Sequence, residues 1–325
     1  MALREIISNF RTGTFRGTPG LFSYFQEKPL PTRNHGIIVG KILPVQKLSQ
    51  FCGLCASCSH CFVHKGARTV NSNSLHTGSR RFSGLTALVT GGTGALGSAL
   101  VDAILEEGGN VAFTYATNEK KASEIMGRTN ADRTASFQCD VRDHEAAQNI
   151  LDSVVHRWSR IDFLINNASI VHDKLFVSMS LADWQSVLDT TLLGAFSFTR
   201  PTVSRMLRQG KGSILNIASI SAIKGVRGQA NYSTAKAGLL GLTRSLAVEL
   251  APHNIRVNAV LPGLMEQGMG AALSKARLED IKSQIPLRRL CSPAEIARLC
   301  IFLLSDDASY VTGQCIGADG GLSAL

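Results

Sequence analysis

The stretch Thr90-Gly91-Gly92-Thr93-Gly94-Ala95-Leu96-Gly97 decides how this chain is interpreted. It ends a short apolar run and leads directly into an amphipathic stretch. Glycines between a strand and a helix let the backbone approach a bound phosphate, and the first N–H groups of the helix are free to bind it. A glycine-rich turn alone is a weak signal, and its position after a strand and before a helix strengthens it. The stretch predicts a phosphate-binding βα unit, with an ordinary flexible loop as the alternative.

The same alternation continues to the end of the chain. Apolar, β-branched runs predict seven strands, at Thr86–Thr90, Asn110–Tyr115, Ala135–Cys139, Phe163–Asn166, Ser213–Ile217, Arg256–Val260 and Cys315–Ala318. Amphipathic stretches predict helices at Leu96–Glu107, Glu119–Met126, His144–Trp158, Leu181–Leu207, Tyr232–Leu250 and Pro293–Leu304. Such alternation favours a parallel sheet that is covered by helices on both faces. We therefore expect one doubly wound α/β domain with a seven-stranded parallel sheet over residues 83–325.

Residues 1–82 have a different character. They hold 11 Lys/Arg and 2 acidic residues, whereas residues 83–325 carry a net charge of only +1. They show no sustained helical or strand periodicity, which predicts an unstructured leader. A basic, acid-poor leader is typical of an organelle transit peptide, with the mitochondrial matrix ahead of the plastid. The alternatives are a disordered bacterial extension, which would leave the protein in the cytoplasm, or a start codon that lies elsewhere.

The end of the leader is more specific. Ser79-Arg80-Arg81-Phe82-Ser83 resembles a matrix-processing site, with arginines two and three residues before a cut after Phe82. The sequence therefore places the boundary between leader and domain at Ser83.

Composition excludes several functional classes. No apolar run reaches the roughly 18 residues that a membrane-spanning helix needs. The near-neutral domain offers no basic field for nucleic acid.

The spacing Cys52-x2-Cys55-x2-Cys58-x2-Cys61 suits zinc or an iron–sulfur cluster. It departs from the ferredoxin pattern and would be lost with the leader, so we predict no metal site. Four further cysteines are predicted to be small buried hydrophobes, at Cys139, Cys291, Cys300 and Cys315.

Five motifs, in order and at normal spacing, resemble the short-chain dehydrogenase/reductase family over residues 84–325. They are Thr90–Gly97, Cys139-Asp140-Val141, Asn166-Asn167-Ala168-Ser169, Pro262-Gly263 and Asp319-Gly320-Gly321. The resemblance implies a Rossmann-type fold and a nicotinamide dinucleotide, with Asp140 near the adenine. It places the cofactor contacts on Gly91, Thr93, Gly94, Leu96, Gly97, Thr117, Asp140, Val141, Asn167, Ala168, Tyr232, Lys236, Pro262 and Gly263. Within the family, Gly228–Tyr232 and Ile285–Arg289 are most similar to 3-oxoacyl-acyl-carrier-protein reductases.

A catalytic group is predicted around Tyr232. Tyr232 and Lys236 lie four residues apart on a predicted helix and so share one face, although a surface pair would show the same spacing. Hydride transfer to a ketone leaves an alkoxide that needs a proton, and an adjacent ammonium brings the tyrosine pKa, ordinarily near 10, closer to neutral. In the family, Ser219 would hold the carbonyl oxygen and Lys236 would also bind the nicotinamide ribose.

Several positions depart from the family pattern. Thr191 stands where the family has a catalytic Asn, and we expect its backbone carbonyl to receive a relay water linked to Lys236. Ser169 replaces a Gly, Gln267 replaces a Thr that contacts the nicotinamide amide, and Ala95 replaces the middle Gly of the loop. These changes leave open a non-catalytic, cofactor-binding partner subunit.

The second predicted strand bears on cofactor choice. The segment Val111–Asn118 contains no acidic residue that would repel the 2′-phosphate of NADP, and Thr117, Asn118, Lys120 or Lys121 can contact that group. The sequence therefore favours NADP over NAD.

The substrate is predicted from the resemblance and from side-chain type. The apolar residues after the sixth predicted strand suit a lid over an acyl chain, although the packing of a short helix would use the same residue types. They are Leu264, Met265, Met269 and Ala271–Leu273. Four basic residues could form a patch that binds an acidic carrier protein, or could simply lie on solvated faces: Arg208, Lys211, Arg227 and Arg256. We expect NADPH-dependent reduction of a 3-oxoacyl thioester on acyl carrier protein, in fatty-acid synthesis, with a dehydrogenase for carbonyl, steroid or sugar-alcohol substrates as the alternative. The resemblance also implies a homo- or hetero-tetramer built through the helices Leu181–Leu207 and Tyr232–Leu250.

Overall fold

The structure is a computed structural model that describes residues 80–268 and 274–324. The predicted leader up to Ser79, the Cys52/Cys55/Cys58/Cys61 group, Met269 and the Ala271–Leu273 part of the lid lie outside the described residues. Across the described ranges, no helix is both long and apolar enough to cross a membrane.

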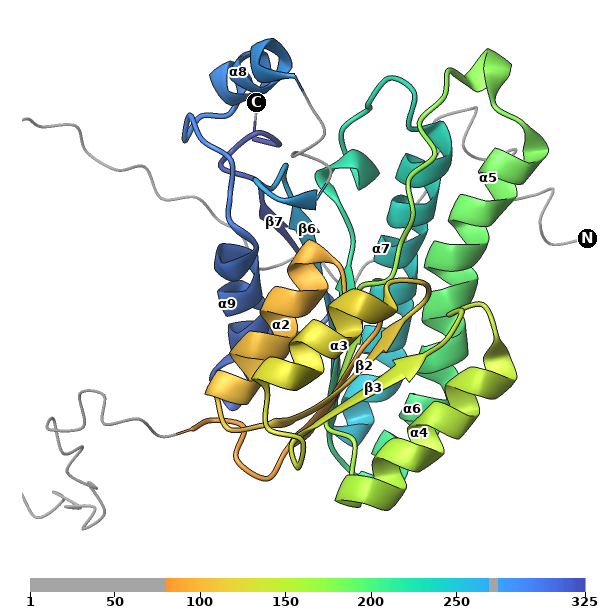
Figure 1. Cartoon of the computed structure of the whole chain (residues 1–325), viewed down its shortest axis with the longest axis vertical. Helices are drawn as coiled ribbons and strands as arrows, with labels where there is room; N and C mark the ends of the chain where they lie inside the picture. The colour runs from red at the N-terminus through yellow and green to blue at the C-terminus, as the bar shows by residue number, and fades with distance from the viewer. Residues whose placement is uncertain (1–79, 269–273, 325) are drawn as a thin grey trace, which may run out of the picture. The chain divides into compact units, whose positions relative to one another are not determined.

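Seven strands form one parallel sheet in the order β3-β2-β1-β4-β5-β6-β7 (Figure 1). Their bounds are β1 Thr86–Val89, β2 Asn110–Tyr115, β3 Thr134–Gln138, β4 Phe163–Asn166, β5 Gly212–Ile217, β6 Ile255–Pro262 and β7 Cys315–Ala318. The chain builds outward from β1 to β3, then returns to the other side of β1 and builds outward from β4. Ligands of such sheets bind where this order reverses, beyond the carboxyl ends of β1 and β4. The predicted doubly wound class is confirmed.

Helices cover both faces of the sheet because successive strand residues point to opposite sides. In β1, Ala87 and Val89 pack into the same core cluster as α2 (Ala95–Glu106), α3 (Glu119–Arg128) and α9 (Pro293–Leu304). Leu88 packs into the opposite cluster with α4 (His144–Trp158), α6 (Gly194–Gln209) and α7 (Ala230–Leu250). Figure 1 shows these two helix layers on either side of the strands. The inner strands β1, β4 and β5 are therefore buried on both faces, which explains their nearly continuous apolar runs, whereas the edge strands β3 and β7 are only partly buried.

Two helical regions differ from the sequence-based expectation. The single helix expected over Leu181–Leu207 is α5 (Leu181–Leu188), then a π-helical turn at Asp189–Leu193, then α6. A further helix, α8 (Lys275–Gln284), was not expected, because its residues are mostly charged and polar and none forms an apolar stripe.

The domain makes contacts before Ser83, where the sequence places its boundary. Phe82 is 1% exposed, and its ring centroid lies 4.6 Å from that of Phe163 on β4. Its N–H group donates to the carbonyl of Glu107, just after α2, at 2.9 Å. Phe82 is thus a core residue of the domain.

Candidate active site

Three glycines shape the turn between β1 and α2. A Cβ atom on Gly97 would lie 2.2 Å from the carbonyl oxygen of Gly91, and one on Gly92 would lie 2.5 Å from the Phe113 side chain. Gly91 has a φ of +68°, which favours glycine. The helix that follows begins at Ala95 without a side-chain cap on its first N–H groups. This cradle fits the pyrophosphate of a dinucleotide.

Asn167 holds this turn against the end of β4. Its side-chain amide donates to the carbonyls of Thr90 and Gly91, at 2.9 and 3.1 Å. In return, the Thr90 hydroxyl accepts from the backbone N–H groups of Asn167 and Ala168, at 3.0 and 3.1 Å. Asn167, which is predicted to contact the cofactor, therefore also fixes the phosphate loop against the end of β4.

A cleft of about 700 Å³ opens at the carboxyl ends of the strands, at the point where the strand order reverses. Most of the residues predicted for the site line it: Gly91, Thr93, Gly94, Leu96, Gly97, Thr117, Asp140, Val141, Asn167, Ala168, Ser219, Tyr232, Lys236, Pro262 and Gly263. Thr191 lies behind the wall, which Thr190 lines in its place. Residues from seven separate segments are therefore brought together in one cavity.

Helix α7 carries Tyr232 and Lys236 side by side into this cleft, and both are buried. The Lys236 Nζ atom donates to the carbonyl of Ile217, at the end of β5, at 2.7 Å. It lies 5.5 Å from the centroid of the Tyr232 ring. Ser219 follows β5, and its Oγ accepts from the N–H group of Ser221 at 3.1 Å. Strand β5 and helix α7 thus present a hydroxyl, a phenol and an amine to one space.

Burial controls the protonation of this group. It raises the pKa of Tyr232 to about 12, and a hydrogen bond with Ser219 opposes that rise. It lowers the pKa of Lys236 to about 7. The expectation that Lys236 brings the tyrosine pKa closer to neutral is wrong for this structure, because desolvation penalises both charged forms. Tyr232 is therefore a neutral proton donor at neutral pH.

Thr191 lies in the π-helical turn between α5 and α6, and it is 2% exposed. Its hydroxyl lies 3.1 Å from the hydroxyl of Ser169, in the loop after β4. Its backbone carbonyl, which was expected to receive a relay water, accepts from the N–H group of Gly194. The two departures from the family pattern at Thr191 and Ser169 are therefore in direct contact.

The end of β2 forms one wall of the cleft. Thr117 is exposed there, and Asn118 caps α3 by accepting from the N–H group of Lys121 at 3.0 Å. The Lys121 ammonium pairs with Glu124 at 3.0 Å. Among the described residues, Lys120 forms no ion pair. Thr117 and Lys120 are thus the groups at this end that are most available to a phosphate.

Arg142 lines the cleft and was missed by the sequence analysis. Its backbone N–H and its guanidinium Nε both donate to the Asp140 carboxylate at 3.0 Å, and this holds the pKa of Asp140 below its usual range. Arg142 follows Asp140 by two residues in the same loop, and this proximity was the signal in the sequence that could have placed it at the site. Other missed lining residues follow β4 or lie on α5 and include Ile170, Val171 and Ser186. On the lid side, Met265 and Gly268 line the cleft, whereas Gln267 is exposed.

Comparison with known proteins agrees with this geometry. A family model described as "Enoyl-(Acyl carrier protein) reductase" matches residues 92–323. The 3-oxoacyl-(acyl-carrier-protein) reductase of Aquifex aeolicus is 40% identical over 74% of this chain and 98% of its own length. That of Thermotoga maritima is 39% identical over 74% and 99%. The crystal structure of levodione reductase matches with a TM-score of 0.71 and 30% identity, over 75% of this chain and 100% of its own.

Proposed function

The chain belongs to the short-chain dehydrogenase/reductase family and is an NAD(P)-dependent oxidoreductase, and we propose that it reduces 3-oxoacyl thioesters on acyl carrier protein to the 3-hydroxyacyl form, in fatty-acid synthesis. The observation that carries the proposal is the assembly of Ser219, Tyr232 and Lys236 in the cleft that also holds the phosphate loop. The similarity to two reductases of this kind over nearly their whole length supports the substrate class.

The chemistry follows from the protonation states in the cleft. When bound, NADPH supplies the hydride for the carbonyl carbon. The Ser219 hydroxyl donates to the carbonyl oxygen and orients it. The neutral Tyr232 hydroxyl then gives its proton to that oxygen as negative charge develops there. Lys236, when protonated, stabilises the phenolate that remains.

The substrate is tested by measuring NADPH oxidation by the full-length chain with acetoacetyl-acyl-carrier-protein, alongside steroid, sugar and simple ketones. We expect the thioester to be the best substrate. In Tyr232→Phe, turnover should fall by about 10² to 10⁴-fold while NADPH affinity stays the same, because the ring still packs and only the proton donor is lost. Normal NADPH binding by the unmodified chain without activity on any ketone would show that it is a non-catalytic subunit.

We propose NADP as the cofactor, supported by the absence of an acidic residue in β2, by Thr117, which lines the cleft, and by the exposed Lys120 three residues further on. Thr117→Asp places a carboxylate where the 2′-phosphate would lie. We expect NADPH affinity to fall by about tenfold or more through charge repulsion, with NADH affinity unchanged or higher. Ser153→Asp, on an exposed position of α4, adds the same charge away from the cleft and is the matched control. Tighter binding of NADH than NADPH by the unmodified chain would contradict the assignment.

We further propose that residues 1–82 contain a transit peptide for the mitochondrial matrix and that the protein is a tetramer. The basic, acid-poor leader supports the first proposal. Exposed apolar side chains on α5, α6 and α7, among them Leu181, Phe196 and Val248, support the second. Cell fractionation separates the matrix from the plastid and the cytoplasm, and analytical ultracentrifugation gives the assembly state.

A further inference from the structure

The chain enters the domain at the amino ends of β1 and β4, at the opposite end of these strands from the cleft. Residues 80–83 form a turn in which the N–H group of Ser83 donates to the carbonyl of Arg80 at 3.1 Å. This turn packs closely on the loop after α2, since a Cβ atom on Gly108 would lie 2.6 Å from the side chain of Arg80. These are the residues in which the sequence shows a matrix-processing pattern.

Phe82 is fixed by its side chain and by both of its backbone groups. Its ring is 1% exposed and packs on Phe163, in the cluster that also contains Ile104 of α2. Its N–H group donates to the Glu107 carbonyl, and its own carbonyl accepts from the N–H group of Leu85, both at 2.9 Å. A peptidase needs an extended, accessible segment around the bond that it cuts. The folded domain offers no such segment at Phe82–Ser83.

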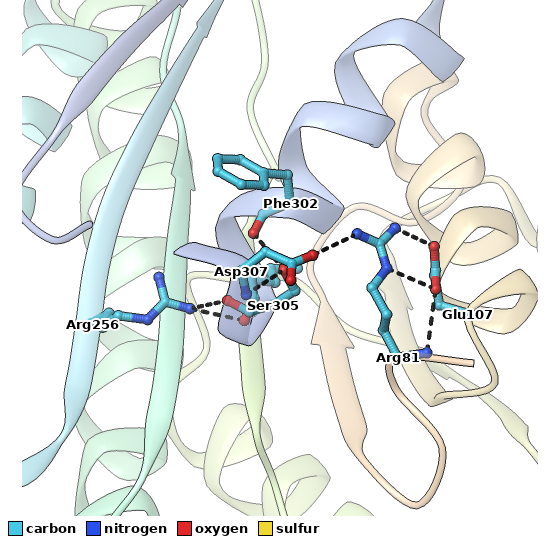
Figure 2. A network of polar contacts seen from close by, with 7 residues as sticks. Arg81, Glu107, Arg256, Phe302, Ser305 and Asp307 are labelled. Carbon is cyan, nitrogen blue, oxygen red and sulfur yellow. Dashed lines mark hydrogen bonds and ion pairs between the residues drawn. The ribbon is translucent and has the colours of Figure 1, made fainter. Parts of the chain in front are cut away.

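Arg81 links two further parts of the domain, as Figure 2 shows. Its Nε donates to the carboxylate of Glu107 at 3.0 Å, and its Nη2 pairs with the same carboxylate. Its Nη1 donates to Asp307, in the 3₁₀ turn after α9 (Asp306–Ala308), at 3.3 Å. Glu107 lies just after α2, so this one side chain joins the ends of two helices that pack on the same face of the sheet.

The contacts continue from this turn into the sheet. The N–H group of Asp307 donates to the Ser305 hydroxyl at 3.3 Å. The carbonyl of Ser305 accepts from Arg256 Nη2, on β6, at 3.0 Å (Figure 2). The segment 80–83 is thereby connected through the turn after α9 to strand β6.

We propose that Arg81 and Phe82 belong to the folded domain and stabilise it, and that removal of the leader leaves both residues on the chain. The bond that is cut in the cell then lies before Arg81 and not after Phe82. The part that concerns removal rests on the proposed leader. A cut after Phe82 in the unfolded precursor would produce a domain with an empty site beside Phe163 and with unpaired carboxylates at Glu107 and Asp307.

The first test compares thermal unfolding of full-length variants. Phe82→Ala should lower the melting temperature by about 10 °C, because it empties a buried aromatic site. Phe82→Leu should lower it less, and Arg81→Gln should lower it measurably. Ser83→Ala, at an exposed neighbour in the same turn, is the matched control and should not change it. A melting temperature for Phe82→Ala and Arg81→Gln equal to that of Ser83→Ala would overturn the proposal.

The second test is the N-terminus of the protein purified from its own cells, read by mass spectrometry. We expect it at or before Arg81. An active, folded protein that begins at Ser83 would overturn the proposal. A protein that retains Met1 would contradict the proposed leader but would keep Arg81 and Phe82 in the domain, so the two failures are distinguishable.

Discussion

Ser169 and Thr191 show how two departures from a family pattern form one structural change. The family has Gly and Asn at these positions, and here two hydroxyls meet at 3.1 Å. Thr is one bond shorter than Asn, and its hydroxyl contacts the hydroxyl of the added Ser. The sequence identified both departures, but it did not indicate their contact, because the residues lie 22 positions apart on different elements. It also failed to indicate the direction of the Tyr232 pKa, which depends on burial.

This contact makes a prediction about the pair. Thr191→Asn alone should destabilise the protein by about 1–3 kcal/mol, because the longer side chain meets Ser169 in a buried site. Adding Ser169→Gly should remove most of that cost, and the double variant should have turnover at least equal to that of the unmodified chain. Denaturant titration gives the free energies of unfolding of the unmodified chain, the two single variants and the double variant. Together these values form a double-mutant cycle. Strictly additive effects would show that the two positions act independently.

At the scale of elements, strands and capped helices were predictable and special turns were not. The predicted strands Asn110–Tyr115, Phe163–Asn166 and Cys315–Ala318 match the structure at both ends. Helix α9 begins as its sequence predicts, since Ser292 and Glu295 form a capping box. The π-helical turn at Asp189–Leu193 was missed, because its residues continue a helical pattern and no local signal marks the extra residue.

The turn between β1 and α2 gives a prediction about two neighbouring glycines. Gly97→Ala should lower both the melting temperature and NADPH affinity, because the new Cβ would lie 2.2 Å from the Gly91 carbonyl oxygen and force the loop open. Gly94→Ala places its Cβ 3.4 Å from the same oxygen, has no positive φ, and should leave the melting temperature nearly unchanged. Calorimetry and a fluorescence titration measure the two quantities. Equal melting temperatures for the two variants would show that the loop is not packed as described.

At the scale of the whole molecule, carboxylates paired with arginines set the response to acid. Arg81 holds the pKa of Glu107 below its usual range, and Arg289 with the cap at Ser292 lowers that of Glu295 to about 2. In the unfolded chain both groups titrate near 4.3, so the unfolded state binds more protons between these values. The stability that they contribute is therefore present above about pH 4.3 and is lost as the pH falls toward 2.

We expect the melting temperature to fall as the pH drops below about 4.3. Glu295→Gln should melt at a lower temperature than the unmodified chain at pH 7, with a difference that shrinks as the pH approaches 2. Glutamine keeps the capping interaction, so this variant isolates the charge. Thermal melts of both proteins from pH 7 to 2.5 give the comparison. A difference that grows on acidification would contradict the pairing.

The reversal of strand order between β1 and β4 also governs when during synthesis the protein can bind its cofactor. The cleft is lined by residues from Gly91 to Gly268, and a chain that leaves a ribosome or an import channel delivers them in that order. The phosphate loop emerges first, but Lys236 and Pro262 arrive some 140 residues or more later. Because a ligand stabilises only the state that binds it, the cofactor is not expected to stabilise a chain that ends before these residues. A chain that has not yet delivered Lys236 and Pro262 therefore lacks part of the cleft that would hold the cofactor.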